Sequence, residues 1–404
     1  MLNKITKIRV IVLVLFIVGS IYFSRIGFNR SQVTKETTRL TTKRTRLNYH
    51  LDFVALSRDL REYASTRNRE LEDELFPWWF DRQSGSFSEN DQSKGIVICT
   101  GDNHFRFTLV ALRALELIGN ELPIEVVYST PNDLSKENRE NLEKSFPNIR
   151  IVDLSNTSID DRSLQLRGWE IKPFAVLASR FRHVLLMDAD VLFLDKPSIL
   201  FQNSFYLKTG TLFFYDRVTL SDETLRWIRT LLSQTNNRSL PQRTQESGVV
   251  LIDKARVLVG LLSTCKLNDH QERKHVTYRH LYGDKDTWWL GFHLIEMSYS
   301  FIPTLTGSIG HITDAGQKVV CGHILHFDEN LRPIWWNGGL FKNRYYSLRD
   351  LVNIEGWLYE GHWQIRAQSC LTNTGQQAKR FNEEQQVLIK NYRNLTRIFF
   401  NINR

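Results

Sequence analysis

Two aspartates, Asp188 and Asp190, stand one residue apart in the stretch "HVLLMDADVLFLD", residues 183–195. A continuous apolar run bounded by polar residues is typical of a strand buried on both faces. Because an unpaired buried carboxylate is very costly, such groups pair with another group or bind a metal ion. Alternate residues of a strand share a face, so both carboxylates are expected to point to the same side.

The elements that position this pair are strands and helices in alternation, which predicts a parallel sheet with helices on both faces. In such sheets ligands bind at the carboxyl ends of the strands, so Asp188 and Asp190 are expected at the rim of a cleft. The predicted strands are 95–100, 123–129, 149–154 and 183–188, and the predicted helices are 105–119, 133–145 and 169–181.

Three interpretations of the Asp-x-Asp element compete. The pair could cap the strand and begin a turn, but apolar residues continue on its far side. A phosphohydrolase of the haloacid dehalogenase type has Asp-x-Asp with a nucleophilic first Asp, but at the start of its core domain, whereas three strand–helix units precede it here. A metal-dependent sugar transferase holds a divalent ion by carboxylates, which neutralises the diphosphate leaving group of a nucleotide-sugar.

Several longer segments favour the third interpretation, because in this order they resemble the fungal-type Golgi α-mannosyltransferases of glycosyltransferase family 71. More distantly, they resemble the glycogenin-type transferases. The resembling segments are "GIVICTGDNHFRFTLVALRAL" with "LPIEVVY", "WEIKPFAVLASRFRHVLLMDADVLFL", "QESGVVLIDK" (245–254), "YGDKDTWWLGF" (282–292) and "HILHFDENLRPIWWNGG" (323–339).

The resemblance implies a GT-A-like α/β fold with a mixed, mostly parallel central sheet. It implies retaining transfer of mannose, with GDP-mannose as donor, to a lumenal glycan or glycoprotein. Asp188, Asp190 and His326 would bind Mn²⁺ or Mg²⁺. His323, three residues before His326, would face the opposite side of the strand. Asp286, with Asp284, is expected near the reacting sugar.

The donor is expected to contact six further residues. Gly248 would permit close backbone approach to the sugar, and Lys172 would contact a phosphate or the nucleotide. Asp102, in the first strand–helix turn, would contact the base. The donor set is Asp102, Lys172, Glu246, Ser247, Gly248 and Trp335.

The amino terminus accounts for the net charge of +9. Residues 1–50 hold ten of the 53 basic residues and one of the 44 acidic ones, so the remainder is balanced and has no basic excess for nucleic acid. Val10–Phe23 is apolar and predicts a membrane anchor. A cleaved signal peptide is the alternative, although Tyr22, Phe23 and Arg25 follow where a small-residue cleavage site would stand.

This gives an expected order of a cytoplasmic tail, a signal anchor, a lumenal stem and neck, a catalytic domain and a carboxy-terminal extension that packs on it. The expected location is the Golgi membrane, single-pass type II. Asn156, Asn237 and Asn394 begin glycosylation triplets. Cys99, Cys265, Cys321 and Cys370 allow three disulfide pairings, and Cys99 is expected to be a small core residue. The expected segments are 1–7, 8–24, 25–93, 94–345 and 346–404.

Two alternative functions remain. One is a hexosyltransferase that uses a UDP-sugar, and the other is a catalytically inactive lumenal glycan-binding protein on the same fold. Metal-dependent hydrolysis of a sugar nucleotide would exclude the binding protein, and a panel of donors would separate the two transferases.

Overall fold

The computed structural model describes residues 52–80, 91–159, 161–233, 236, 238–313, 316–343, 345, 347–365 and 369–402. The predicted tail and anchor and the first part of the stem lie outside these residues, as does Asn237. Among the residues described, no helix has both the length and the hydropathy needed to cross a membrane.

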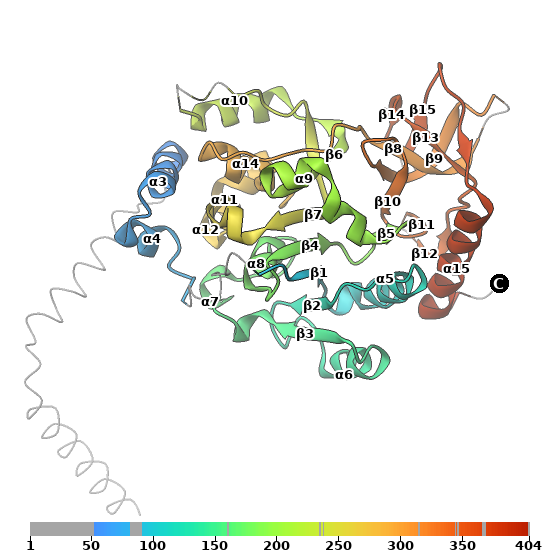
Figure 1. Ribbon diagram of the computed structural model, residues 1–404, viewed down its shortest axis with the longest axis horizontal. Helices are drawn as coiled ribbons and strands as arrows, with labels where there is room; N and C mark the ends of the chain where they lie inside the picture. Colours follow the sequence, from blue (N-terminus) through green and yellow to red (C-terminus); the bar gives the residue numbers. More distant parts are fainter. Residues whose placement is uncertain are drawn as a thin grey trace, which may run out of the picture. The chain divides into compact units, whose positions relative to one another are not determined.

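A six-stranded sheet forms the centre of the structure (Figure 1), with strand order β3-β2-β1-β4-β7-β6. Strands β1 to β4 pair in parallel, whereas β7 is antiparallel to both β4 and β6. The predicted α/β class with a mixed, mostly parallel central sheet is therefore confirmed. The strands are β1 (Lys94–Cys99), β2 (Ile124–Tyr128), β3 (Ile149–Asp153), β4 (His183–Met187), β6 (Thr211–Thr219) and β7 (Arg243–Asp253).

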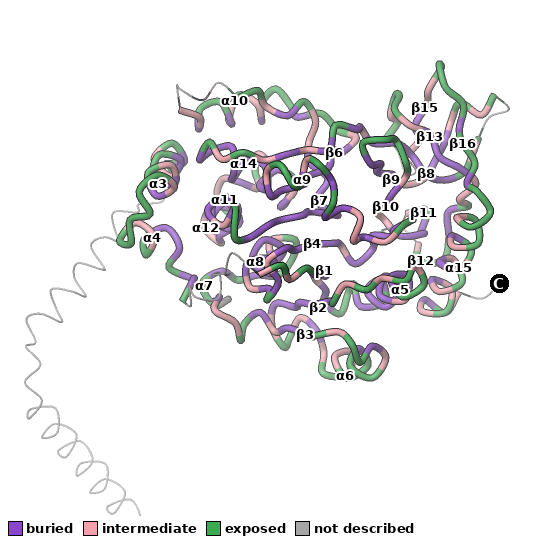
Figure 2. The backbone as a smooth tube through the Cα atoms, viewed as in Figure 1, coloured by how far each residue is buried: buried purple, intermediate pink, exposed green. Residues whose placement is uncertain are grey.

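The central strands β1, β2, β4 and β7 of this sheet are largely buried on both faces (Figure 2). Ile96 and Ile98 of β1 belong to the hydrophobic cluster that contains helix α5 (Phe105–Leu117). Val97, between them, points to the other face and is also fully buried. Helix α8 (Ile171–Ala178) contacts β1 and β4. This double coverage explains why the strands read as continuous apolar runs.

A second, antiparallel sheet lies beside the first and has strand order β14-β15-β9-β8-β13-β16. A disulfide joins Cys321 of β9 to Cys370 of β15, which are directly opposite partners in the ladder. Cys99 and Cys265 are not disulfide-bonded. The strands are β8 (Gly307–Ile312), β9 (Val319–Phe327), β13 (Gly356–Tyr359), β14 (His362–Gln364), β15 (Ser369–Thr372) and β16 (Lys379–Arg380).

The chain passes from the first sheet to the second through the Asp188–Asp190 turn. After β4 and this turn, the short strand β5 (Leu192–Phe193) pairs with β10 (Pro333–Asn337), which pairs in turn with β9. The two aspartates therefore lie at the junction of the sheets, and this junction is where a cleft forms.

The ends of the described chain pack on the same compact unit, which begins at Phe53. Helix α3 (Phe53–Thr66) contacts α10 (Asp222–Leu231) and α14 (Thr287–Leu294), and Trp78 donates a hydrogen bond to Asp269 at 3.1 Å. Helix α15 (Glu383–Phe400) contacts α5. The described parts of the predicted neck and of the carboxy-terminal extension thus pack on this unit.

The remaining elements complete the chain between these parts. They are α4 (Arg69–Leu75), η2 (Asp102–His104), α6 (Lys136–Ser145), η3 (Leu154–Asn156), α7 (Asp161–Leu164), η4 (Pro197–Gln202), α9 (Ser204–Thr209), α11 (Lys254–Leu267), α12 (His270–Glu272), η5 (Arg273–Thr277), α13 (Tyr278–His280), β11 (Phe341–Asn343) and β12 (Ser347–Leu351).

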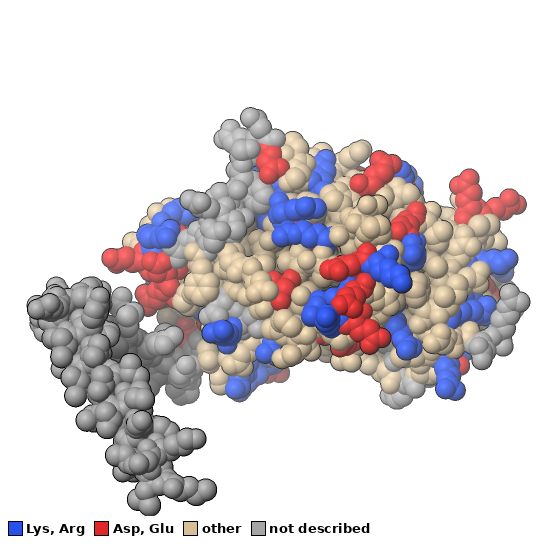
Figure 3. Space-filling view, turned by 90° about the horizontal axis from the view of Figure 1, so that it is seen from below, with Lys and Arg blue, Asp and Glu red and all other residues tan. Residues whose placement is uncertain are grey.

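Charges of both signs are interspersed over the face seen in Figure 3, where Lys and Arg lie among Asp and Glu. This agrees with the balanced composition of residues 51–404. The face presents no continuous field of one sign.

Candidate active site

The Asp188–Asp190 turn borders two adjoining cavities of about 340 and 310 Å³. Trp169, Lys172, Asp188 and Asp190 line both cavities. The turn is fixed by its backbone, because the Asp188 N–H donates to the Gly248 carbonyl at 2.8 Å and the Gly339 N–H donates to the Asp190 carbonyl at 2.7 Å. The prediction that both aspartates lie at a cleft rim at the carboxyl end of β4 is confirmed.

Lys172 supplies the positive charge nearest to this acidic turn. Its Nζ lies 2.8 Å from Asp188 Oδ1 and 3.4 Å from Asp284 Oδ2, and it donates to the Ser247 hydroxyl at 3.2 Å. Burial alone would lower the pKa of Lys172, but the two carboxylates outweigh burial and raise it. Burial raises the pKa of Asp188, and the Lys172 ammonium opposes that shift. Lys172 therefore holds the carboxylates of two separate segments together.

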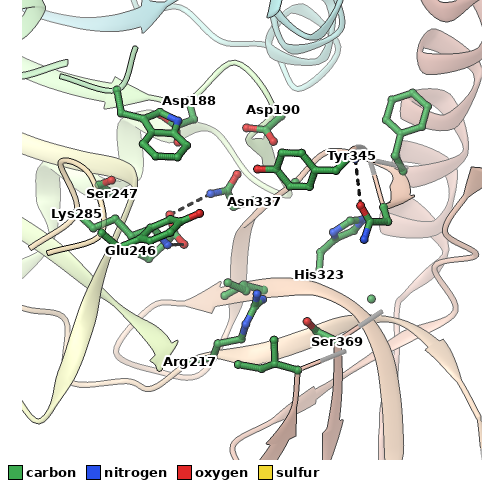
Figure 4. A pocket seen from close by; sticks show the side chains of 18 of the residues that line it. Asp188, Asp190, Arg217, Glu246, Ser247, Lys285, His323, Asn337, Tyr345 and Ser369 are labelled. Carbon is green, nitrogen blue, oxygen red and sulfur yellow. Dashed lines mark hydrogen bonds and ion pairs between the residues drawn. The ribbon is translucent and has the colours of Figure 1, made fainter. Parts of the chain in front are cut away.

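A second buried ionic cluster lies at the wall of the larger cavity (Figure 4). Lys285 Nζ lies 2.5 Å from Asp216 and 3.1 Å from Glu246, and Asn337 donates to the other Glu246 oxygen at 3.0 Å. Burial would raise the pKa of Glu246, but the surrounding positive charges and the hydrogen bond from Lys285 together outweigh burial and lower it. Glu246 is therefore held as a carboxylate at the cavity wall.

The smaller cavity is built by the first strand–helix turn and the end of β2. Asp102 lines it, and its Oδ1 accepts hydrogen bonds from the Ser135 N–H and the Asn138 side chain, both at 2.8 Å. Burial would raise the pKa of Asp102, but the hydrogen bonds from Ser135 and Asn138 together outweigh burial and lower it. Cys99, expected in the core, is partly exposed and lines this cavity.

Besides the two aspartates of the turn, four of the predicted site residues line the larger cavity. They are Lys172, Glu246, Ser247 and Asp284. Gly248 lies in neither cavity wall. A Cβ at Gly248 would meet the Asn337 amide nitrogen at 2.9 Å. The close approach that this glycine allows is therefore to Asn337, and not to an open part of the cleft.

The structure corrects the prediction for Asp286, which is expected with Asp284 to be catalytic. It is buried, lines neither cavity, and accepts hydrogen bonds from the Gln245 N–H at 2.9 Å and the Trp289 indole at 2.8 Å. Burial raises its pKa to about 6. It stands at the N-cap of α14 and ties that helix to β7, so its position is structural. Asp284 faces the cavity because it is two residues earlier, before the helix begins.

The predicted site residues His326 and Trp335 line neither cavity, because their rings stack on each other in the interior. Their centroids are 3.9 Å apart with an interplanar angle of 17°, and both residues are buried and absent from the cavity walls. Burial lowers the pKa of His326 to about 3. Among the residues that the structure describes, no three His, Cys, Asp or Glu side chains group as a metal site. His326 is therefore not placed as a third ligand.

Several residues that line the larger cavity are not among the predicted site residues. Lys285 lies inside the "GDKD" segment and Asn337 inside "WWNGG", so the motifs themselves could have indicated both residues. The sequence predicts that His323 lies on the strand face opposite His326, and the structure shows that this face meets the cleft. Arg217 lies outside the resembling segments, and its sequence surroundings gave no signal.

Comparison with known proteins supports the resemblance. A family model with the description "Mannosyltransferase putative" matches residues 93–237 and 229–328. The α-1,3-mannosyltransferase MNT3 of Saccharomyces cerevisiae is 26% identical over 319 residues, which cover 64% of this chain and 50% of MNT3. The α-1,3-mannosyltransferase MNN1 of the same yeast is 24% identical over 313 residues, which cover 61% and 40%.

The similarity to solved structures is weaker. The mannosyltransferase Ktr4p from S. cerevisiae matches with a TM-score of 0.33 at 13% identity, over 59% of this chain and 75% of that one. The galactosyltransferase LgtC matches with a TM-score of 0.35 at 17% identity, over 52% and 73%. The chain spans about half the length of the curated relatives that it matches. Since the family model covers more than half of the chain, this protein belongs to that mannosyltransferase family.

Proposed function

We propose that this protein is a retaining α-mannosyltransferase that transfers mannose from GDP-mannose to a glycan or glycoprotein acceptor on a GT-A-like domain. The observation that carries the proposal is the pair of cavities that meet at Asp188 and Asp190 in a member of a mannosyltransferase family. The smaller cavity would take the nucleotide, and the larger cavity would take the two sugars. Lys172, Asp188 and Asp190, which line both cavities, would hold the diphosphate between them.

A divalent ion, Mn²⁺ or Mg²⁺, fits this arrangement with two protein ligands. Asp188 and Asp190 present carboxylates to both cavities, and divalent ions in nucleotide sites are commonly held by one or two carboxylates with substrate phosphates and water. The ion, when bound, would neutralise charge on the departing diphosphate. Lys172, at 2.8 Å from Asp188, is placed to add a second positive charge beside that group.

The chain's own residues would then orient the donor and the acceptor and exclude water from them. Retention of the α anomer allows the departing phosphate to take the proton of the acceptor hydroxyl on the face where that hydroxyl attacks. Such a reaction needs orientation and electrostatic stabilisation more than a strong protein base. Lys285 and Asn337 hold Glu246 ionised and fixed at the wall of the larger cavity, where it would hydrogen-bond sugar hydroxyls.

Nucleotide binding tests the donor. GDP is expected to raise the melting temperature of the purified full chain more than UDP does, with manganese present. A ligand that binds only the folded state at about 100 times its dissociation constant stabilises by about 2.7 kcal/mol, which differential scanning fluorimetry detects. Transfer or hydrolysis of GDP-mannose in a panel with UDP-glucose and UDP-galactose is the companion assay. Stronger stabilisation by UDP would transfer the assignment to a UDP-sugar hexosyltransferase.

We also propose a single-pass type II orientation in the Golgi membrane, motivated by Val10–Phe23 and the glycosylation triplets. Asn156 is exposed in a short turn and is expected to carry a glycan. The Asn394 triplet lies within α15, where the Thr396 hydroxyl is buried and donates to the Tyr392 carbonyl at 2.9 Å.

Intact vesicles are expected to protect the large carboxy-terminal part from added protease, and digestion without detergent would exclude this orientation.

A further inference from the structure

The larger cavity has a wall that the proposed donor contacts leave unused. Asp188 and Asp190 lie on one side of this cavity, and Arg217 and Ser369 lie on the opposite side (Figure 4). Arg217 comes from the end of β6, His323 from β9 and Ser369 from β15. β6 belongs to the central sheet, and β9 and β15 belong to the second sheet, so the wall is part of the rigid framework and not a surface loop.

Two buried nitrogens in this wall have no hydrogen-bond partner among the described residues. They are Arg217 Nε and His323 Nε2. Leaving such polar groups unpaired in the interior costs free energy, so a native structure normally satisfies them with a ligand or water. Their presence on one cavity wall indicates that this wall is shaped to hydrogen-bond something that enters the cavity.

The positions of both side chains are fixed by their surroundings. The Arg217 guanidinium lies over the Trp363 ring at 5.6 Å from its centroid, and His323 lies against Gly338, where a Cβ would come within 2.8 Å of His323 Nδ1. The Cys321–Cys370 disulfide joins the two strands that carry His323 and Ser369. A preorganised wall of this kind loses little conformational entropy when a ligand binds.

An aromatic pair at the same cavity offers the complementary kind of surface. Trp169 is 45% exposed and Tyr282 is 69% exposed, with ring centroids 5.6 Å apart, and both line the larger cavity. Trp169 lies against Gly283, where φ is +64° and a Cβ would meet the indole at 2.7 Å. Exposed rings beside polar groups suit pyranoses, which present C–H faces as well as hydroxyls.

The charged side chains that line the larger cavity balance in sign, which favours an uncharged ligand. They are Lys172, Arg217, Lys285 and Lys342 against Asp188, Asp190, Glu246 and Asp284. Lys172 and Lys285 are ion-paired with cavity carboxylates. Burial lowers the pKa of His323 to about 4, so the imidazole is neutral at pH 7 and offers one donor and one acceptor nitrogen. A hydroxyl group, which both donates and accepts, matches that imidazole better than a phosphate does.

We propose that the wall formed by Arg217 and His323 is the acceptor subsite of this protein, which binds a neutral pyranoside through its hydroxyls while Tyr282 and Trp169 contact its apolar face. This inference rests on the proposed function, because it assigns the smaller cavity and the shared aspartates to the donor. It names a substrate class, the non-reducing pyranose end of a neutral glycan, for the larger cavity.

The test compares Arg217→Met, Arg217→Lys and His323→Gln with the wild-type full chain. Binding of methyl α-D-mannopyranoside, methyl α-D-glucopyranoside and mannose 6-phosphate is measured by calorimetry with GDP and manganese present. Arg217→Met is expected to weaken binding of the best methyl pyranoside about tenfold or more, since a hydrogen bond from a charged group is lost. Arg217→Lys restores part of the affinity, and the GDP dissociation constant stays within about twofold.

Arg58→Met is the matched control, because the Arg58 side chain is 69% exposed and lines neither cavity. Unchanged pyranoside affinity in both Arg217→Met and His323→Gln would overturn the subsite, as would an equal loss of GDP affinity. Tighter binding of mannose 6-phosphate than of both methyl pyranosides would overturn its neutral character. Failure of the wild-type chain to turn over any sugar nucleotide would instead overturn the proposed function, so the two failures are distinguishable.

Discussion

Replacement of Asp190 by Asn is expected to lower mannosyl transfer at least about 100-fold, since the metal contribution to charge stabilisation amounts to several kcal/mol. Asp190 is 6% exposed and lines both cavities, so it lies where the proposed diphosphate and ion would sit. Asparagine keeps the shape of the side chain and removes its charge. Titration with Mn²⁺ in the presence of GDP is expected to show weakened metal binding in this variant, independently of turnover.

Asp195→Asn is the matched control, because Asp195 is an exposed carboxylate five residues along the same segment and lines neither cavity. Asp195→Asn should retain wild-type metal affinity and turnover, and circular dichroism should show both variants folded. Wild-type activity of Asp190→Asn after treatment with a chelator would exclude the metal role of the turn. Asp188 would then act through its ion pair with Lys172, and Asp190 through its backbone contact with Gly339.

Replacement of Lys172 by Met is expected to destabilise the fold by about 3–5 kcal/mol, the usual cost of removing one partner from a buried ion pair. The ammonium stands between Asp188 and Asp284, at 2.8 and 3.4 Å, and its side chain is 6% exposed. Without it, the half-buried carboxylate of Asp188 and the buried carboxylate of Asp284 lose the positive charge between them. Chemical denaturation without metal or nucleotide measures the loss, and Lys136→Met, with a side chain 82% exposed, is the control.

The loss in Lys172→Met is expected to grow with pH. Burial raises the pKa of Asp188 above its usual range, so the folded chain binds that proton more tightly than the unfolded chain. The contribution of this group to stability is greatest below its unfolded pKa of about 4 and falls as pH rises. Removal of the ammonium raises that pKa further, so the destabilisation should be larger at pH 8 than at pH 5. A loss independent of pH would contradict this electrostatic explanation.

The sequence by itself determined the central sheet and the position of the acidic turn. Apolar runs without polar interruption, as in β1 and β4, can be accommodated only where both faces of a strand are covered. Alternation with helical segments then requires parallel neighbours, and the end of β4 must lie at the ligand-binding edge. The position of Lys172 near the acidic turn could also be predicted from the sequence. A helix that precedes a parallel strand begins near the carboxyl end of that strand.

Only the tertiary structure decided which side chains near the motifs face the cleft. The period of two along β9 separates His323 from His326, but it cannot say which of the two faces is covered by Phe214 and Trp335. Asp286 turns inward because the Gln245 N–H, 41 residues away in sequence, needs an acceptor. The Cys321–Cys370 pairing and the position of Arg217 depend likewise on strand partners distant in sequence. Local sequence fixes a side chain's spacing along its own element, whereas the neighbours that bury it are set by packing between elements.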